Sequence, residues 1–134
     1  MLVKTLDGEA YEFKIPEKIA KGNKRGTSQF HKIARKILKQ LFVGNRIYEE
    51  LPIYIGTNQT LYVDFYLPTY NLMIEVHGQQ HYEYNSHFYK NKMEWLKAVE
   101  RDNRKAEWCE LNKIKLITLK YNEQDKWQAQ LMNF

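Results

Sequence analysis

Residues 61–82 read LYVDFYLPTYNLMIEVHGQQHY, and their pattern is the most informative about the central sheet. Residues 61–67 alternate between apolar and polar side chains, which is typical of a half-buried strand. The next four residues, PTYN, predict a turn, and the apolar run over residues 72–76 predicts a buried strand. Two neighbouring strands joined by a short turn therefore carry several acidic and histidine side chains.

Upstream of this stretch, the sequence predicts a hairpin, a helix and a further strand. Residues 2–15 alternate around the turn signal Asp7-Gly8 and predict a β-hairpin. Residues 28–42 place apolar side chains at helical spacing after an N-cap serine and predict a helix. Residues 47–55 predict a strand in which Pro52 favours an edge position or a bulge.

Downstream, the pattern predicts a helix, a strand and a short terminal helix. The helix covers residues 89–111, and the last strand covers residues 114–119. In the tail, Trp127 and Leu131 are expected to pack back onto the body. The order of elements predicts one α/β domain over residues 1–134, with a mixed β-sheet flanked by helices.

Composition excludes several classes of protein. With 43% hydrophobic and 14% aromatic residues, the 134-residue chain is typical of a globular domain and not of a disordered one. It contains no apolar run of about 18 residues, which a membrane-spanning helix requires. Its N-terminus lacks the apolar core of a secretory signal, and its one cysteine, Cys109, cannot form an internal disulfide. We therefore expect a cytoplasmic protein with no membrane partner.

The net charge of +5 is concentrated in one segment, which no acidic residue interrupts. Such a segment suits a polyanion such as DNA, whose counterions it displaces, although a solvated helix face is the alternative. The basic residues of this segment are Lys18, Lys21, Lys24, Arg25, Lys32, Arg35, Lys36, Lys39 and Arg46. We take Lys24, Arg25, Lys32, Arg35 and Lys36, together with Gln80 after the second strand of the opening stretch, as candidate DNA-binding residues.

The candidate chemistry begins with two carboxylates. Asp64 lies within the first strand of the opening stretch, and Glu75 lies near the end of the second. Adjacent antiparallel strands can bring both carboxylates to one side of the sheet, where they can hold Mg²⁺, with Mn²⁺ as the alternative. A lone Asp in a strand is often structural, but a Glu among apolar residues is expensive to bury without a partner.

Polar residues follow the second carboxylate closely. His77 lies two residues after Glu75, so its side chain faces the same side of an extended strand and can exchange protons near neutral pH. Gly78 permits close approach, and Gln80 and His81 add further polar reach. Either histidine alone is more often structural than catalytic, but the group as a whole favours an active site.

This arrangement resembles the PD-(D/E)xK nuclease superfamily, with His77 at the place of the usual lysine. Within it, the segments DFYLPTYNLMIEVHG and VERDNRKAEWCELNKIKLITL are most similar to the very short patch repair (Vsr) endonucleases and to related phage and homing-type nucleases. The resemblance covers residues 28–119, between the N-terminal hairpin (1–19) and the tail (120–134). It implies the restriction-endonuclease-like fold and a metal-dependent DNA endonuclease of a bacterial or phage-infected cell.

The resemblance also assigns roles to single residues. It makes Asp64 the central metal ligand, Glu75 a second ligand and His77 a catalytic histidine. His81 resembles a second family histidine at a spacing one residue tighter, and Asp102 is expected to orient His77 or His81. The candidate catalytic set is therefore Asp64, Glu75, His77, His81 and Asp102.

The sequence also departs from the Vsr pattern. His31 stands where that family has a glutamate in the first helix, so Glu49 or Glu50 from the next strand is the alternative source of this acid. Vsr enzymes lack an acid at the Glu75 position, whereas the broader superfamily has one. The Cys and His residues of the Vsr structural zinc site are missing, so mismatch specificity does not follow from the resemblance.

DNA contact is further indicated by an aromatic cluster after the second strand. Its members can stack on bases or wedge between them, or they can pack in the core and at the start of the next helix. They are Tyr82, Tyr84, His87, Phe88 and Tyr89.

Three functions remain open on the sequence. The first is a phosphodiester-cleaving enzyme acting on double-stranded or branched DNA, alone, as a homodimer or with an accessory specificity partner. The second is a non-catalytic DNA-binding or assembly protein that retains the nuclease fold. The third is a structure-selective junction resolvase.

Overall fold

A four-stranded mixed sheet is the centre of the computed structural model, which describes residues 1–16 and 28–134. Its strands follow the order β3–β4–β5–β6, in which β3 pairs antiparallel with β4, β4 pairs antiparallel with β5, and β5 pairs parallel with β6. The bounds are Tyr48–Gly56 for β3, Gln59–Leu67 for β4, Leu72–His77 for β5 and Lys115–Lys120 for β6. These strands confirm the predicted ones to within two residues at each end.

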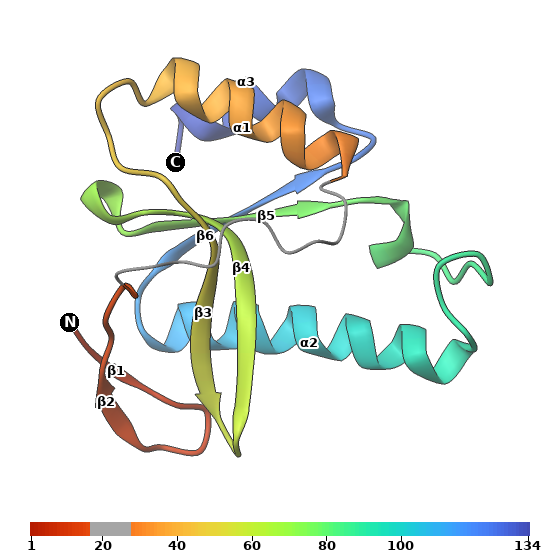
Figure 1. The fold of residues 1–134 in the computed structure, drawn as a ribbon, viewed down its shortest axis with the longest axis horizontal. Helices are drawn as coiled ribbons and strands as arrows, with labels where there is room; N and C mark the ends of the chain where they lie inside the picture. The colour runs from red at the N-terminus through yellow and green to blue at the C-terminus, as the bar shows by residue number, and fades with distance from the viewer. Residues whose placement is uncertain (17–27) are drawn as a thin grey trace.

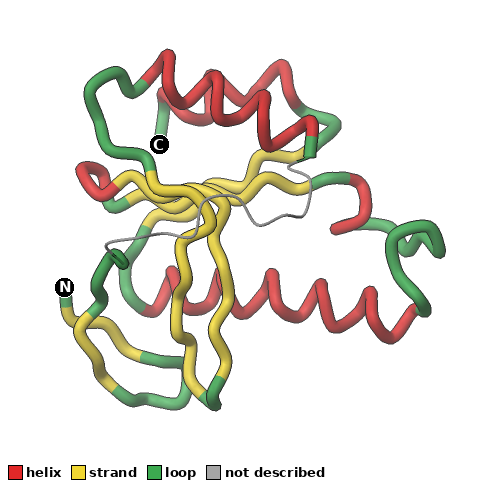
Figure 2. The backbone as a smooth tube through the Cα atoms, viewed as in Figure 1, coloured by secondary structure: helices red, strands yellow, loops and turns green. Residues whose placement is uncertain are grey.

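Helices cover both faces of this sheet (Figure 1). Helices α1 (Gln29–Leu41) and α3 (Gln124–Met132) lie on one face, and the long helix α2 (Lys92–Leu111) lies on the other. The tube drawing shows the same three layers (Figure 2). The predicted α/β class and the mixed sheet flanked by helices are confirmed. Within the described ranges, none of the helices has the length and apolar character needed to cross a bilayer.

Helix α1 forms where the sequence predicts it. The hydroxyl of Ser28 accepts a hydrogen bond from the backbone N–H of His31 at 3.1 Å, which satisfies one of the free amides at the start of the helix. Ala34 and Leu38 are buried at i, i+4 spacing, while the opposite face carries lysines.

Strand β5 separates two hydrophobic cores. Leu72, Ile74 and Val76 pack on the side of α1 and α3, whereas Met73 packs on the side of α2 with Trp108. Because side chains alternate along a strand, Glu75 and His77 continue the row that begins at Met73. The face of β5 that looks toward α2 therefore changes from apolar to polar along its length.

The N-terminal hairpin forms a separate two-stranded sheet. Strands β1 (Leu2–Lys4) and β2 (Ala10–Glu12) pair antiparallel, as the Asp7-Gly8 turn predicts. Val3 and Phe13 pack into the core on the α2 side. Pro52 lies in β3, which is an edge strand of the central sheet, so the expected edge position is confirmed.

Helices α2 and α3 can be compared with the helices predicted in the second half of the chain. Helix α2 begins at Lys92 with Asn91 as its N-cap, so the predicted start at residue 89 is wrong by three residues. The amides of Phe88 and Tyr89 bond instead to the Asn85 carbonyl, which forms a turn before the helix. In α3, Trp127 and Leu131 are buried, as predicted, and the Trp127 indole donates to the Lys120 carbonyl at 2.8 Å.

Candidate active site at the split between strands

Asp64 and Glu75 lie where strands β4 and β5 separate. Their ladder runs from Leu67 opposite Leu72 to Phe65 opposite Ile74 and then stops. Beyond it, the Val76 amide donates to Asp64 Oδ2 at 2.7 Å, and the Asp64 amide donates to Glu75 Oε1 at 3.3 Å. Side-chain oxygens thus replace carbonyls as acceptors, and the two carboxylates are held beside each other as the sequence predicts.

The two carboxylates repel each other in a poorly hydrated setting. Glu75 is only 3% exposed, whereas the Asp64 side chain keeps 30% of its surface in solvent. Burial, and then the charge of Glu75, raise the pKa of Asp64 to about 8. A divalent cation would relieve this repulsion, and the donors are the carboxylate oxygens that Mg²⁺ prefers. The residues therefore fit the expected metal.

Lys105 is a functional candidate that the sequence analysis missed. Its ammonium lies 3.2 Å from Glu75 Oε2 and 4.0 Å from Asp102 Oδ1, and the side chain is only 15% exposed. It comes from α2, where it follows Asp102 by three residues and precedes the buried Cys109 by four. This spacing along one helical face was the available signal, because a lysine on a buried face requires a partner.

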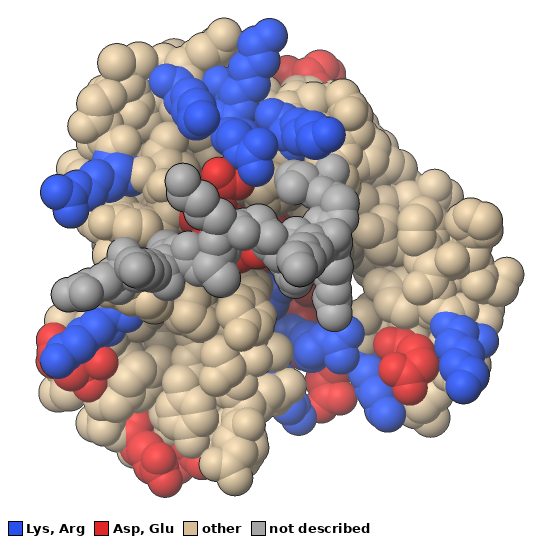
Figure 3. All heavy atoms as spheres, in the orientation of Figure 1, with Lys and Arg blue, Asp and Glu red and all other residues tan. Residues whose placement is uncertain are grey.

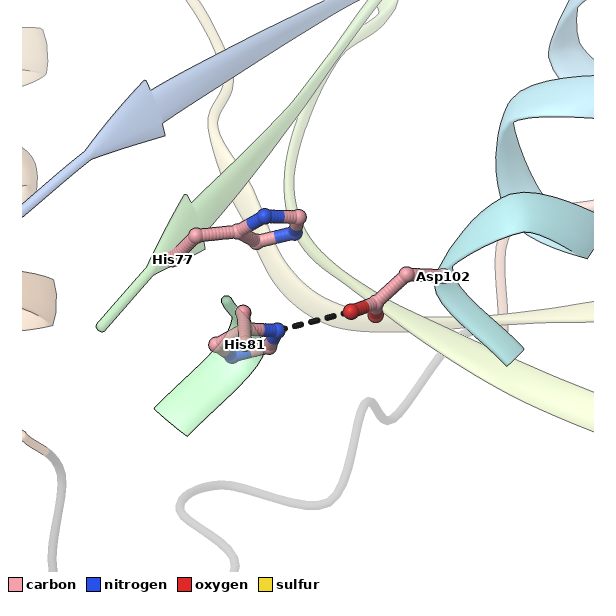
Figure 4. A group of neighbouring side chains, drawn as sticks. All are labelled: His77, His81 and Asp102. Carbon is pink, nitrogen blue, oxygen red and sulfur yellow. Dashed lines mark hydrogen bonds and ion pairs between the residues drawn. The ribbon is translucent and has the colours of Figure 1, made fainter. Parts of the chain in front are cut away.

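His77, His81 and Asp102 form a cluster beside the carboxylates (Figure 4). The two imidazole rings stack with their centroids 4.1 Å apart, and His81 Nδ1 lies 2.7 Å from Asp102 Oδ2. His77 comes from the end of β5, His81 from the short 3-10 helix Gln79–His81, and Asp102 from α2. Asp102 therefore orients His81, one of the two histidines considered from the sequence.

Each side of the His77 ring has a different environment. Nδ1 lies 3.0 Å from the Tyr82 hydroxyl. Nε2 is buried and has no hydrogen-bond partner among the described residues, and Glu75 Oε2 lies 3.8 Å away. The pKa of the Asp102 carboxyl depends on this cluster. Burial raises this pKa, but the hydrogen bond from His81 and its charge outweigh burial, so the pKa lies below its ordinary value.

His31 links the first helix to Asp64. Its Nε2 lies 2.8 Å from Glu49 Oε1 and its Nδ1 lies 3.8 Å from Asp64 Oδ1, while its ring stacks on Phe65. Arg35 completes the arrangement by donating from Nη2 to Glu49 Oε1 at 2.7 Å. Of the two glutamates proposed as alternatives to a helix acid, Glu49 is thus placed beside His31 and is joined to Asp64 through it.

The predicted DNA-binding residues have different surroundings. Lys24 and Arg25 lie outside the described residues. Lys32 and Lys36 are exposed on α1, where basic side chains gather at the top of the space-filling view (Figure 3). Arg35 is turned toward Glu49, so it connects α1 to β3. DNA contact by any of these residues stays a prediction.

Gln80 and Gly78 lie close together at the end of β5. A side chain at Gly78 would come within 2.5 Å of Gln80 Oε1, so glycine leaves room for the Gln80 amide. The Gln80 carbonyl accepts from the Trp95 indole at 3.0 Å, which ties this turn to α2. The Gln80 side chain therefore lies against Gly78, and the close approach of a backbone or a phosphate to Gly78 stays a prediction.

The aromatic residues after β5 are mostly on the surface. Phe88 is 56% exposed and contacts the ring of His87, so it is not a core residue. Tyr84 is also exposed and packs edge-on against Trp95. Tyr82 is the member of the cluster that reaches the site, through the hydrogen-bond contact of its hydroxyl with His77.

Comparison with known proteins gives three viral relatives. The chain is 37% identical over 68 residues to uncharacterized protein 307L of Invertebrate iridescent virus 6. The matched region covers 51% of this chain and 34% of that protein. It is 35% identical over 65 residues to uncharacterized protein 033L of Invertebrate iridescent virus 3, covering 48% of this chain and 34% of the relative. It is 39% identical over 70 residues to uncharacterized protein 094L of Frog virus 3, covering 52% of this chain and 45% of the relative.

These matches span between a third and a half of the curated relatives' length. No protein-family model matches the chain. No solved structure matches it either.

Proposed function

We propose that this chain is a metal-dependent DNA endonuclease of the restriction-endonuclease-like fold, with its centre at Asp64, Glu75 and His77. The observation that carries the proposal is the split between β4 and β5. There, two mutually repelling carboxylates, one of them buried, lie beside a buried histidine. Such a group of perturbed, mutually close ionisable residues favours an active site over a structural arrangement.

Asp64 and Glu75 would hold Mg²⁺ or Mn²⁺ in this proposal. The ion, when bound, would polarise a phosphate and lower the pKa of a water molecule. Backbone amides already fix one oxygen of each carboxylate, so the remaining oxygens are oriented before any ligand arrives. Lys105 supports Glu75 from the α2 side and adds positive charge near the negative charge that develops during phosphodiester cleavage.

The histidines would handle protons. When Asp102 accepts a hydrogen bond from His81 Nδ1–H, the other ring nitrogen is left as a proton acceptor or donor. His77 lies between this pair and Glu75, so it is placed to take a proton from an attacking water or to give one to the leaving oxygen. Asp102 is a positioning residue in this scheme because it acts through His81.

DNA would approach along α1. Lys32, Lys36 and Lys39 are exposed at i, i+4 and i+7, so they lie near one another on the helix and can contact successive phosphates. Phosphate contacts position a duplex without reading its sequence. A cytoplasmic setting is part of the proposal, in line with the single cysteine.

One observation favours a second candidate, a non-catalytic DNA-binding protein that retains this fold. His31 stands where Vsr enzymes have an acid, and Glu49 is engaged by both His31 and Arg35. Glu49 is therefore joined to Asp64 only through His31, and the metal would rest on Asp64 and Glu75.

A nicking assay on supercoiled plasmid separates these candidates. We expect cleavage with Mg²⁺ or Mn²⁺, its loss with EDTA, and a drop of about a thousandfold or more for Asp64→Asn, since a ligand and its charge effect are both removed. Asp125→Asn, an exposed aspartate in α3, is the matched control and should cleave normally.

Three results of the nicking assay would change the proposal. Absence of cleavage by the native protein with every divalent metal and DNA form would favour the non-catalytic candidate. Full activity of Asp64→Asn would place the chemistry elsewhere. Cleavage of branched but not linear duplex would identify a junction resolvase.

A further inference from the structure

We infer that His77, His81 and Asp102 form a second metal site that takes a transition-metal ion, such as Zn²⁺ or Co²⁺, through imidazole nitrogens. One ligand atom from each of the three residues lies within 4.8 Å of the other two. The cluster is separate in its ligands from the oxygen site at Asp64 and Glu75. A ring nitrogen that coordinates this ion cannot take up a proton, so the ion-bound form of the cluster excludes the proton-transfer role proposed above for the same nitrogens. The inference itself does not depend on DNA cleavage.

The strongest evidence is the state of the His77 ring. His77 as a whole is 9% exposed, and its Nε2 atom is buried. Nε2 also lacks a hydrogen-bond partner among the described residues. A buried polar atom without a partner loses its hydration and gains nothing in exchange, so an unpaired one calls for an explanation. A bound cation supplies it, because an imidazole nitrogen with a free lone pair is a metal ligand.

The other side of the ring has the partner that a ligand histidine needs. Nδ1 of His77 lies 3.0 Å from the Tyr82 hydroxyl. If Nδ1–H donates to this oxygen, the lone pair of Nε2 is free to face the cluster. Metal-binding histidines are held in this manner, with the second nitrogen fixed by an oxygen acceptor.

The chemistry of the donors selects the kind of ion. Two imidazoles and one carboxylate suit Zn²⁺, Co²⁺ and similar transition metals, whereas Mg²⁺ prefers oxygen ligands and keeps its waters. The Lys105 ammonium is nearer to Glu75 Oε2, at 3.2 Å, than to Asp102 Oδ1, at 4.0 Å, so it pairs mainly with Glu75. His81 and Asp102 are half-buried, so an ion can reach them from solvent.

Binding requires a small rearrangement of side chains. Ligand atoms around a tetrahedral ion with bonds of about 2.0–2.1 Å are about 3.3 Å apart. The stacked imidazoles must therefore tilt toward each other, and the contact between His81 and Asp102 must give way to the ion. We expect side-chain rotation to be sufficient for such a change, because His77 ends β5, His81 follows in the short 3-10 helix directly after it, and Asp102 comes from α2.

The test is a titration of Co²⁺ without DNA into the native protein and into Asp64→Asn, in which the oxygen site is disabled. We expect both proteins to bind one ion with the visible absorption of nitrogen-ligated Co²⁺, and Zn²⁺ to displace it. Introducing His81→Gln or Asp102→Asn into either protein should weaken Co²⁺ binding about a hundredfold, as expected when a ligand is lost. His87→Gln, which removes an exposed histidine outside the cluster, should bind as before.

Three results would overturn the site: no Co²⁺ or Zn²⁺ binding to the native protein, loss of binding in Asp64→Asn, or unchanged binding in both His81→Gln and Asp102→Asn. A second measurement needs no variant and so does not depend on their folding. In the native protein, Zn²⁺ should shift the ring-nitrogen resonances of His77 and His81 but not those of His87. Equal shifts for all three, or none, would contradict the site, whatever the nicking assay gives.

Discussion

The ionised form of Asp64 destabilises the metal-free protein. Burial and the neighbouring Glu75 raise its pKa to about 8, far above the ordinary 3.8. The folded state therefore holds a proton that the unfolded chain releases, and stability falls as the pH rises from about 4 to about 8. Function and stability make opposite demands on this residue, as is common for active sites.

Asp64→Asn should consequently stabilise the protein in EDTA. The asparagine carbonyl can still accept from the Val76 amide but carries no charge beside Glu75. We expect a melting temperature about 5 °C above native at pH 8 and no difference near pH 4, where the native carboxyl is neutral. Asp125→Asn should not be stabilised at either pH, because its carboxylate lies in the first turn of α3 and favours the helix. A lower melting temperature for Asp64→Asn at pH 8 would contradict this account.

Lys105 and Glu75 form a second pair whose members depend on each other. Removing the ammonium with Lys105→Met would leave the buried Glu75 carboxylate without its neighbouring positive charge. We expect a loss of about 3 kcal/mol in the free energy of unfolding, measured with urea in EDTA, and recovery of much of it in Lys105→Met with Glu75→Gln. Lys126→Met is the control, since that lysine is 65% exposed in its pair with Glu123 and should change stability by less than about 1 kcal/mol. Equal losses in both single variants would argue against a special role for Lys105.

At the scale of elements, α1 has two distinct faces. One buries Ala34 and Leu38 against the sheet, and the other presents lysines to solvent. Arg35 lies between the two faces and is held by Glu49, so the helix is attached to β3 by charge as well as by packing.

The exposed face gives a prediction for DNA binding. Lys32→Gln with Lys36→Gln should weaken binding to any duplex sequence and reduce the slope of log affinity against log salt by about 2, one unit for each lost phosphate contact. Lys115→Gln is the matched control, because Lys115 pairs with Leu72 at the opposite end of β5 from His77. Fluorescence anisotropy over a range of salt concentrations measures both slopes. An unchanged slope in the double variant would move the DNA surface away from α1.

Local patterns sufficed to predict most elements. Alternation predicted β4, a continuous apolar run predicted β5, and helical spacing with Ser28 predicted α1, because the forces that decide these elements act between near neighbours. The same reasoning placed Asp64 and Glu75 together across one turn. It missed Lys105, which meets Glu75 from 30 residues away, and it could not choose between Glu49 and Glu50, since these contacts depend on how α1 and α2 lie on the sheet.

For the whole molecule, the sheet topology places the candidate chemistry at one end of β5. The parallel partner β6 continues beside β5 as far as His77, while the ladder to the antiparallel partner β4 ends at the pair of Phe65 and Ile74. Asp64 and Glu75 lie where β4 and β5 separate, His77 ends β5, His81 follows it in the 3-10 helix, and Asp102 faces His81 from α2. Both proposed metal sites therefore lie at the same end of β5.

The N-terminal hairpin has a consequence for how the protein behaves in a crowded solution. Outer strands of sheets offer backbone groups to other chains and so invite self-association. Here the Leu6 amide bonds to the Ile55 carbonyl at 2.8 Å, and the Tyr11 hydroxyl bonds to the Tyr54 carbonyl at 2.8 Å. The chain's own first residues therefore occupy the end of β3 that a foreign strand would need, and they protect the fold against aggregation at that position.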